Sequence, residues 1–311
     1  MASVLVAGGG GFVGSALVAA LVGGEHDVSV MTTSSATTHH PVRVVRLDLW
    51  HPEAVADAES APRYDWVFNL AAYGVDPSQN DPEASRLANA ELPLAFADLA
   101  RRAGASAFVH VGSAFEYAEP IGRRRLSESD PLESRKHYGA SKAAGSLAVI
   151  EASRKSHLNA VVARLFGVYG AGERPWRLLP SLYASLVSGQ SVPLTEGSQV
   201  RDFLYVDDAV AGLVSLAKAI SDGSQTPCIV NLCSGVEVTV RQFAETVADV
   251  LGAPRELLQF GAMPMRPHEI AYLVGDVSRL NRTTPWRPAH SLERGIGMAT
   301  AELSAKVRSA G

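Results

Sequence analysis

The stretch SVLVAGGGGFVGSALVAALVG (residues 3–23) carries the strongest structural signal in the chain. A short apolar run is followed at once by a glycine-rich turn, and then by an alanine- and leucine-rich segment of helical length that begins near Phe12. Gly8, Gly11 and Gly14 have the spacing GxxGxxG. Glycines let a backbone approach a pyrophosphate closely, and a helix N-terminus supplies free N–H groups and a positive dipole end. The stretch therefore predicts a strand, a phosphate-binding turn and a helix; a merely flexible turn is the alternative.

Short apolar runs alternate with segments of helical length through the first two thirds of the chain. The runs lie at residues 3–7, 27–31, 42–47, 66–70, 107–112, 160–166 and 228–232. Most are continuous rather than alternating, as expected of strands buried on both faces of a parallel sheet. Residues 12–23 and 89–104 lie between runs and predict crossover helices. The order predicts an α/β fold with a doubly wound parallel (Rossmann) sheet and helices on both faces.

The pattern changes beyond residue 171, where loops and prolines interrupt the chain. Its 311 residues exceed the length of about 100–200 residues that is typical of one domain. We therefore predict two domains. Residues 1–170 with about 203–235 form a dinucleotide-binding Rossmann domain, and about 171–202 with 236–311 form a smaller C-terminal substrate-binding domain.

Composition excludes several classes of protein. Hydrophobic residues make up 47% and charged residues 19%, as in soluble globular proteins with a sizeable core. The formal net charge of -4 offers no basic footprint for nucleic acid. No run of about 20 apolar residues could cross a bilayer, and no basic segment precedes the first apolar run as it does in a secretory signal. We predict a soluble cytoplasmic protein without membrane partner or metal site, in which Cys228 and Cys233 are buried thiols; a disulfide between them is the alternative.

The end of the second strand bears on the choice of dinucleotide. Sites that prefer NAD usually place Asp or Glu there, where it bonds the ribose hydroxyls. This chain has Thr32, followed by Thr33 and Ser34, whose hydroxyls could bond a 2′-phosphate that a carboxylate would repel. The pattern favours NADP(H) over NAD(H). After the third strand, Asp48, with Leu49 beside it, is either an adenine contact or a cap of the helix that follows.

Tyr138 and Lys142 have the spacing YxxxK in HYGASK. Residues four apart lie on one face of a helix, so phenol and ammonium point to the same place. A free tyrosine has a pKa of about 10, and a neighbouring cation together with an oxidised nicotinamide lowers it, which makes a workable general acid/base. Ser113 ends the fifth strand, at the edge where doubly wound folds bind ligands. Its hydroxyl is predicted to bond a substrate oxygen beside Tyr138; a strand-end cap is the alternative.

The order of the motifs resembles that of one enzyme family. These motifs are GGGGFVG, NLAA (69–72), Asn89, Ser113, YGASK (138–142), RLFGVYG (164–170), RDFLYVDD (201–208) and TPWRP (284–288). They occur in the order and spacing of the extended short-chain dehydrogenase/reductases, and the chain resembles this family over nearly its whole length. The family includes nucleotide-sugar epimerases, dehydratases and 4-ketoreductases.

The resemblance implies roles for individual residues. Tyr138 would be the acid/base, Lys142 would bind the nicotinamide ribose and lower the tyrosine pKa, and Ser113 would assist. Nine residues would bind the cofactor: Gly8, Gly11, Phe12, Val13, Gly14, Leu70, Ala71, Ala72 and Phe166. Three would bind the substrate: Phe115, Arg201 and Arg266. The two arginines would hold a nucleotide diphosphate, since guanidinium groups suit phosphate oxygens; for either taken alone, a surface ion pair is the alternative.

Departures from the family pattern narrow the predicted reaction. The 4,6-dehydratases carry an Asp-Glu pair where this chain has Ala114 and Phe115, so the acid and base for water elimination are missing. The usual Asn of the R-x-x-N motif is Gly167. The strings GSAFEY and RLFGVYG most resemble sugar 4-ketoreductases of deoxysugar pathways.

The leading hypothesis is therefore the NADPH-dependent reduction of a nucleotide-linked 4-keto-6-deoxyhexose at C4. The runner-up is a nucleotide-sugar 4-epimerase that uses tightly bound NAD. A reductase of non-sugar carbonyls and a non-catalytic cofactor-sensing module are the remaining alternatives. The resemblance also implies a homodimer that pairs the YxxxK helix and the helix before it.

Overall fold

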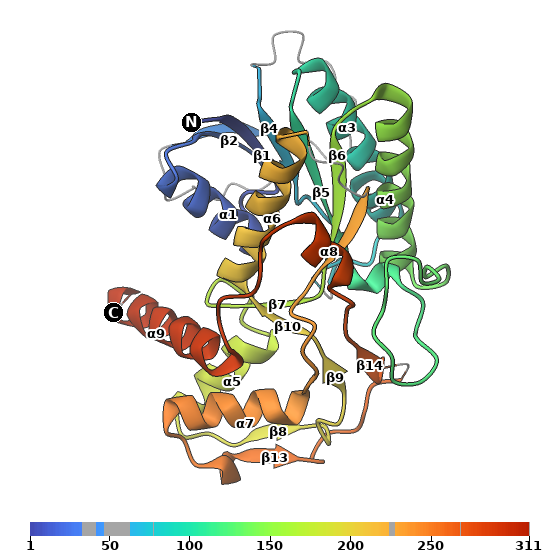
Figure 1. The fold of residues 1–311 in the computed structure, drawn as a ribbon. Helices are drawn as coiled ribbons and strands as arrows, with labels where there is room; N and C mark the ends of the chain where they lie inside the picture. Colours follow the sequence, from blue (N-terminus) through green and yellow to red (C-terminus); the bar gives the residue numbers. More distant parts are fainter. Residues whose placement is uncertain (33–41, 47–62, 77, 224–227, 268, 311) are drawn as a thin grey trace.

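The computed structural model describes residues 1–32, 42–46, 63–76, 78–223, 228–267 and 269–310 (Figure 1). Seven parallel strands form one sheet in the order β11-β6-β5-β4-β1-β2-β3. They are β1 (Ser3–Ala7), β2 (Asp27–Thr32), β3 (Arg43–Arg46), β4 (Trp66–Asn69), β5 (Ala107–Ser113), β6 (Ala160–Leu165) and β11 (Ile229–Leu232). Every strand comes from one of the seven predicted runs, and the order reverses direction at β1, as in doubly wound sheets. The predicted Rossmann fold is confirmed.

Successive side chains of the central strands face two different hydrophobic layers. Val4 and Val6 of β1 pack into the layer that contains Leu17 of α1 (Phe12–Gly23) and Leu213 of α6 (Val206–Ser221). Leu5 and Ala7 of β1 pack on the opposite side, against α3 (Leu92–Arg102) and α4 (His137–Ser156). Both faces of the sheet are therefore covered, which explains why the strands are continuously apolar.

Helix α1 coincides with the predicted segment, but the helix predicted at 89–104 is interrupted. The structure has α2 (Pro82–Arg86), a π-helical turn η2 (Leu87–Glu91) and then α3. Pro93 has no N–H to bond the carbonyl of Asn89 four residues earlier, so that carbonyl is released from the helical ladder. It turns toward α4, where a Cβ on Gly145 would collide with it. The side chain of Asn89 also reaches α4, through a 3.1 Å bond from Nδ2 to Ser141 Oγ.

Smaller elements follow β6, and apart from α8, which packs beside β11, they gather beyond the carboxyl ends of the large sheet (Figure 1). The strands are β7 (Gly167–Tyr169), β8 (Val192–Leu194), β9 (Val200–Arg201), β10 (Phe203–Tyr205), β12 (Val238–Thr239), β13 (Leu258–Phe260) and β14 (Tyr272–Leu273). The helices are α5 (Leu178–Val187), α7 (Val240–Leu251), α8 (Ser278–Thr283) and α9 (Leu292–Ala310), with the 3-10 turn η4 (Arg255–Leu257). Another 3-10 turn, η3 (Ala114–Glu116), lies earlier in the chain, between β5 and α4. The division into two domains at the predicted boundaries stays a prediction. In the described part of the chain, no helix is both long and apolar enough to span a membrane.

The two cysteines are free thiols, so the disulfide alternative is wrong. Cys233 is buried, as predicted, but Cys228 is only partly buried. Cys228 precedes the first residue of β11, at the amino end of a strand that pairs on one side only, with β6. The apolar run CIVNL therefore predicts the strand β11 correctly, but the first residue of the run, Cys228, lies before the strand and is only partly buried.

Candidate active site

The turn between β1 and α1 needs glycine at specific positions. Gly8 has a φ of +78°, and a Cβ on it would lie 2.7 Å from the backbone nitrogen of Ala71. A Cβ on Gly14 would collide with the carbonyl oxygen of Gly8. Gly9, which the GxxGxxG spacing leaves out, is equally constrained, because its Cβ would lie 2.7 Å from a methyl carbon of Val30. Gly11 is the least restricted of the three predicted glycines.

The same turn leaves the N-terminus of α1 open to a ligand. Gly11 is its N-cap and supplies no side chain to bond the first N–H groups. Phe12 and Val13 are partly buried at the start of the helix. A close-packed glycine turn against uncapped N–H groups fits a pyrophosphate, since it removes side chains from the approach and offers donors and a positive dipole end.

The loop after β4 packs directly on this turn. Asn69 is fully buried, and its Oδ1 accepts a 3.1 Å hydrogen bond from the N–H of Ala71. The backbone of Leu70 donates to the carbonyl of Ala7 at 2.9 Å. These bonds hold Leu70 and Ala71 beside Gly8, on the side where the resemblance implies a cofactor contact, and the next residue, Ala72, is partly buried.

Of the residues predicted to choose between the two dinucleotides, the structure describes Thr32. It is buried and ends β2. Thr33, Ser34, Asp48 and Leu49 lie outside the described residues. The preference for NADP(H) therefore stays a prediction.

Ser113, Tyr138 and Lys142 meet where β5 ends against the start of α4. Burial raises the pKa of Tyr138 above its ordinary value, while a hydrogen bond with Ser113 lowers it. The Oγ of Ser113 also accepts a 3.2 Å bond from the N–H of Phe115 and caps η3. Ser113 therefore acts as a cap, as the alternative states, and its predicted bond to a substrate oxygen stays a prediction.

Lys142 is 2% exposed, and its Nζ donates a 2.8 Å hydrogen bond to the carbonyl of Val111. Burial lowers its pKa to about 8, although the negative charge of Glu116 opposes that shift. In this arrangement the ammonium is held by the backbone of β5. The predicted lowering of the Tyr138 pKa by Lys142 stays a prediction for the protein with its cofactor.

A cleft of about 640 Å³ opens beside these residues, and all three predicted substrate residues line it. Phe115 comes from η3, Arg201 from β9, and Arg266 from the segment before β14. Phe166, predicted to lie near the nicotinamide, also lines the cleft. Residues from both halves of the chain therefore converge on one site.

Arg201 has a carboxylate partner in this cleft. Its Nη2 donates to Glu269 Oε1 at 2.6 Å, and burial lowers its pKa while Glu269 raises it. Arg266 is exposed. The alternative that Arg201 forms an ion pair thus holds in part, because Arg201 both faces the cleft and has a carboxylate partner.

A third arginine of the cleft was missed by the sequence analysis. Arg177 is the N-cap residue of α5, and its Nε donates to Glu173 Oε2 at 3.3 Å. The other oxygen of Glu173 accepts a 3.1 Å bond from the N–H of Gly170, and burial raises the pKa of this carboxyl. Arg177 lies close enough to lower the pKa of Tyr138. None of the motifs named in the sequence includes Arg177.

Residues 4–233 match the NAD dependent epimerase/dehydratase family. The chain belongs to this family. The expected resemblance to extended short-chain dehydrogenase/reductases is therefore confirmed.

Relatives of this family member cover nearly its whole length. The dTDP-6-deoxy-L-talose 4-dehydrogenase (NAD(P)(+)) of Kitasatospora kifunensis is 29% identical over 325 residues, which cover 98% of this chain and 97% of the relative. The dTDP-glucose 4,6-dehydratase of Streptomyces griseus is 27% identical over 321 residues, covering 96% and 93%. Among solved structures, MoeE5 in complex with UDP-glucose and NAD has a TM-score of 0.83 at 25% identity, covering 98% of this chain and 99% of that one.

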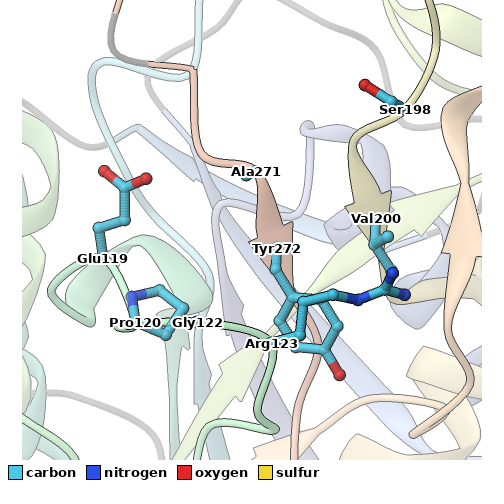
Figure 2. A pocket seen from close by; sticks show the side chains of 8 residues that line it. All are labelled: Glu119, Pro120, Gly122, Arg123, Ser198, Val200, Ala271 and Tyr272. Carbon is cyan, nitrogen blue, oxygen red and sulfur yellow. The ribbon is translucent and has the colours of Figure 1, made fainter.

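This epimerase/dehydratase family member has a second, smaller pocket of about 380 Å³ (Figure 2). None of the predicted site residues lines it. Its residues are Glu119, Pro120, Gly122, Arg123, Ser198, Val200, Ala271 and Tyr272. Figure 2 shows Arg123 lying across Tyr272, and both side chains bond Glu237, at 3.1 and 3.0 Å. This pocket is lined by one arginine, whereas the main cleft is lined by three, so it offers less for an anion than the main cleft does.

Proposed function

We propose that this protein is an NADPH-dependent reductase of a nucleotide-linked 4-keto-6-deoxyhexose, acting at C4. The observation that carries the proposal is the position of Ser113 and of Phe115, on which Tyr138 packs, in a cleft that is also lined by Arg177, Arg201 and Arg266. A proton donor for a carbonyl oxygen and cations for a diphosphate then share one site. The 29% identity to a dTDP-6-deoxy-L-talose 4-dehydrogenase supports the same class of substrate.

The glycine turn is the part of the chain that fits a dinucleotide. Gly8 and Gly14 leave no room for side chains, and the uncapped start of α1 supplies N–H donors to a pyrophosphate. Leu70, Ala71 and Phe166 would line the path toward the reacting carbon. When bound, a reduced nicotinamide supplies the hydride for C4. We propose NADPH rather than NADH because Thr32, and not a carboxylate, ends β2.

Tyr138 delivers the proton that completes the reduction. Because burial raises its pKa, the phenol keeps its proton at neutral pH and can donate it to the developing alkoxide at O4. One hydride added to C4 and one proton added to O4 convert the ketone to a secondary alcohol. Ser113 bonds the same oxygen, and the charge of Lys142 favours the phenolate that Tyr138 becomes.

The arginines hold the substrate through its diphosphate. Guanidinium groups bond phosphate oxygens through paired N–H donors. Glu173 orients Arg177, and Glu269 orients Arg201, so each fork is held before the substrate arrives. Preorganised donors lose less side-chain entropy on binding.

Elimination of water is the reaction that the cleft is least equipped to perform. Ala114 and Phe115 follow Ser113, and neither side chain can act as an acid or a base. We therefore propose that the substrate arrives with its 4-keto group already formed.

The first experiment identifies the cofactor. The purified protein is denatured, any released nicotinamide is identified, and the empty protein is titrated with NADPH and NADH. NADPH preference, with NADPH oxidation on adding dTDP-4-keto-6-deoxyglucose, supports the reductase. Stoichiometric NAD⁺ retained through purification supports the 4-epimerase instead. In the reductase, Thr32→Asp should weaken NADPH binding and spare NADH binding, because a carboxylate repels the 2′-phosphate.

Two variants separate catalysis from binding. Tyr138→Phe should lower kcat by roughly 100-fold or more while leaving the Kd for NADPH unchanged, since it removes only the acid. Full activity in this variant would refute the proposed mechanism. Equal loss of NADPH binding would show that the substitution disturbs the site as a whole.

A further inference from the structure

Glu116 is a fully buried carboxylate that the proposed reaction does not use. It lies three residues after Ser113, in the turn η3. Its Oε1 accepts hydrogen bonds from the N–H of Ser113 at 2.8 Å and from Ser146 Oγ at 2.9 Å. Its Oε2 accepts a 2.8 Å bond from Arg164 Nε. One side chain thus joins the end of β5, the middle of α4 and the end of β6.

The neighbours of Glu116 are adapted to it. A Cβ on Gly112 would collide with Oε1, so the strand makes room for the carboxylate. Arg164 is also buried, and its guanidinium lies 4.4 Å from the centre of the Tyr117 ring. The Nη1 of Arg164 has no hydrogen-bond partner. A buried ion pair with an unsatisfied donor is a costly way to stabilise a fold, because apolar residues of similar volume often do as well or better.

We propose that Glu116 is a positioning residue, which fixes Ser113 at the end of β5 and holds α4, with Tyr138 and Lys142, against that strand. The proposal rests on the proposed function, because it concerns the same three side chains. Its geometric basis is that Glu116 bonds the backbone of Ser113 directly and bonds α4 one turn beyond Lys142, at Ser146. Loss of these bonds frees the two halves of the acid–base site to move relative to each other.

Because Glu116 is charged, it also affects the pKa of Lys142 and of Tyr138, and this effect gives a second way to test the proposal. Burial lowers the pKa of Lys142, and the carboxylate raises it; the carboxylate likewise raises the pKa of Tyr138. His110 of β5 also faces Lys142, but burial and the lysine charge hold its pKa well below the ordinary value, so it is neutral. Besides Glu116 and Lys142, the charged group near Tyr138 is Arg177, and Glu116 itself faces Arg164 and Tyr117.

The sign of the expected shift follows from these charges. Removing the negative charge leaves Arg164 uncompensated and lowers the pKa of both Lys142 and Tyr138. Reduction requires both groups to be protonated. The basic limb of the pH profile of kcat/KM should therefore move to lower pH.

The test uses the full-length enzyme with NADPH and dTDP-4-keto-6-deoxyglucose. Glu116→Gln should lower kcat by roughly 10- to 100-fold with little change in KM, and move the basic limb down by about 1 pH unit. Glu116→Asp keeps the charge, so the basic limb of its pH profile should lie at the wild-type pH, while its kcat should be only partly restored. The matched control is Ser146→Ala, which removes one bond to Glu116 without removing charge and should leave the limb in place. An unshifted limb and an unchanged kcat in Glu116→Gln would overturn the proposal.

A measurement without substrate distinguishes failure of this proposal from failure of the proposed function. With ¹³C-labelled lysine, the NMR titration of Lys142 should fall near pH 8 in the wild type and lower in Glu116→Gln. If the wild type reduces no 4-keto sugar but this shift appears, the function is wrong and the role of Glu116 stands. If Glu116→Gln does not fold, Glu116→Gln with Arg164→Met removes the buried pair together. A normal kcat in that double variant would likewise overturn the proposal.

Discussion

The rings of Phe115 and Tyr138 meet edge to face, with 6.2 Å between their centroids and an interplanar angle of 71°. Phe115 is nevertheless 49% exposed, and it lines the main cleft. A large aromatic surface thus lies beside the proposed proton donor, Tyr138. If Tyr138 reaches O4 of the sugar, Phe115 faces the substituents on the neighbouring carbons. An apolar wall there favours a methyl group over a hydroxymethyl group.

Phe115→Ala should therefore weaken the preference for 6-deoxy substrates. A methyl group in a hydrophobic pocket contributes about 1–3 kcal/mol, so kcat/KM for the 6-deoxy ketone should fall by roughly 10-fold or more. The Kd for NADPH should not change. Val187→Ala is the control, because Val187 is also exposed but lies at the end of α5, outside the cleft lining. Equal kcat/KM in Phe115→Ala and the wild type would place the methyl group elsewhere.

Arg177→Met should raise KM for the nucleotide sugar. Hydrogen bonds to charged groups contribute about 1.5–3 kcal/mol, which corresponds to a 10- to 150-fold weaker complex. Because Arg177 lowers the pKa of Tyr138, its loss should raise that pKa, so the basic limb should not move to lower pH as in Glu116→Gln. Arg174→Met is the matched control: Arg174 lies in the same loop, over the ring of Trp176, and does not line the cleft. Similar KM values in the two variants would exclude a phosphate contact at Arg177.

The fold was predictable because its signals are local. A strand buried on both faces is a continuous apolar run, and α1 begins where the glycines end, so both could be recognised from short segments. Tyr138 and Lys142 were recognised for the same reason, since a spacing of four defines a helix face. Ser113 followed from its place at the end of a predicted strand.

What escaped prediction depends on contacts between distant segments. The π-helical turn follows from Pro93 together with the approach of Gly145 on another helix. Glu116 pairs with Arg164, 48 residues away, and nothing in GSAFEY indicates that the glutamate is buried. The orientation of Arg177 requires the buried carboxylate of Glu173. Sequence spacing supplies the residue types, but only packing decides which of them face the cleft.

Substitutions in the glycine turn should have unequal effects, although the GxxGxxG spacing treats its glycines alike. In Gly14→Ala the new Cβ would collide with the Gly8 carbonyl, so the turn must shift and NADPH binding should weaken by at least roughly 100-fold, as expected of a misplaced site. In Gly11→Ala the nearest atom, also the Gly8 oxygen, is 3.3 Å away, and a shift of a few tenths of an ångström suffices. Calorimetric titration with NADPH measures both variants. Equal affinities would show that the turn does not close on Gly8 as described.

The predicted homodimer can be tested at exposed leucines of the neighbouring helices α3 and α4. Leu94 of α3 is 46% exposed and Leu147 of α4 is 51% exposed, on two helices that pack against each other. Exposed large apolar side chains lower the free energy when a second copy covers them. Leu147→Glu would place a charge in that contact, so the variant should sediment as a monomer where the wild type sediments as a dimer. Val307→Glu, on the similarly exposed side of α9, should stay dimeric. A dimer that survives Leu147→Glu but not Val307→Glu would assign the interface to α9 instead.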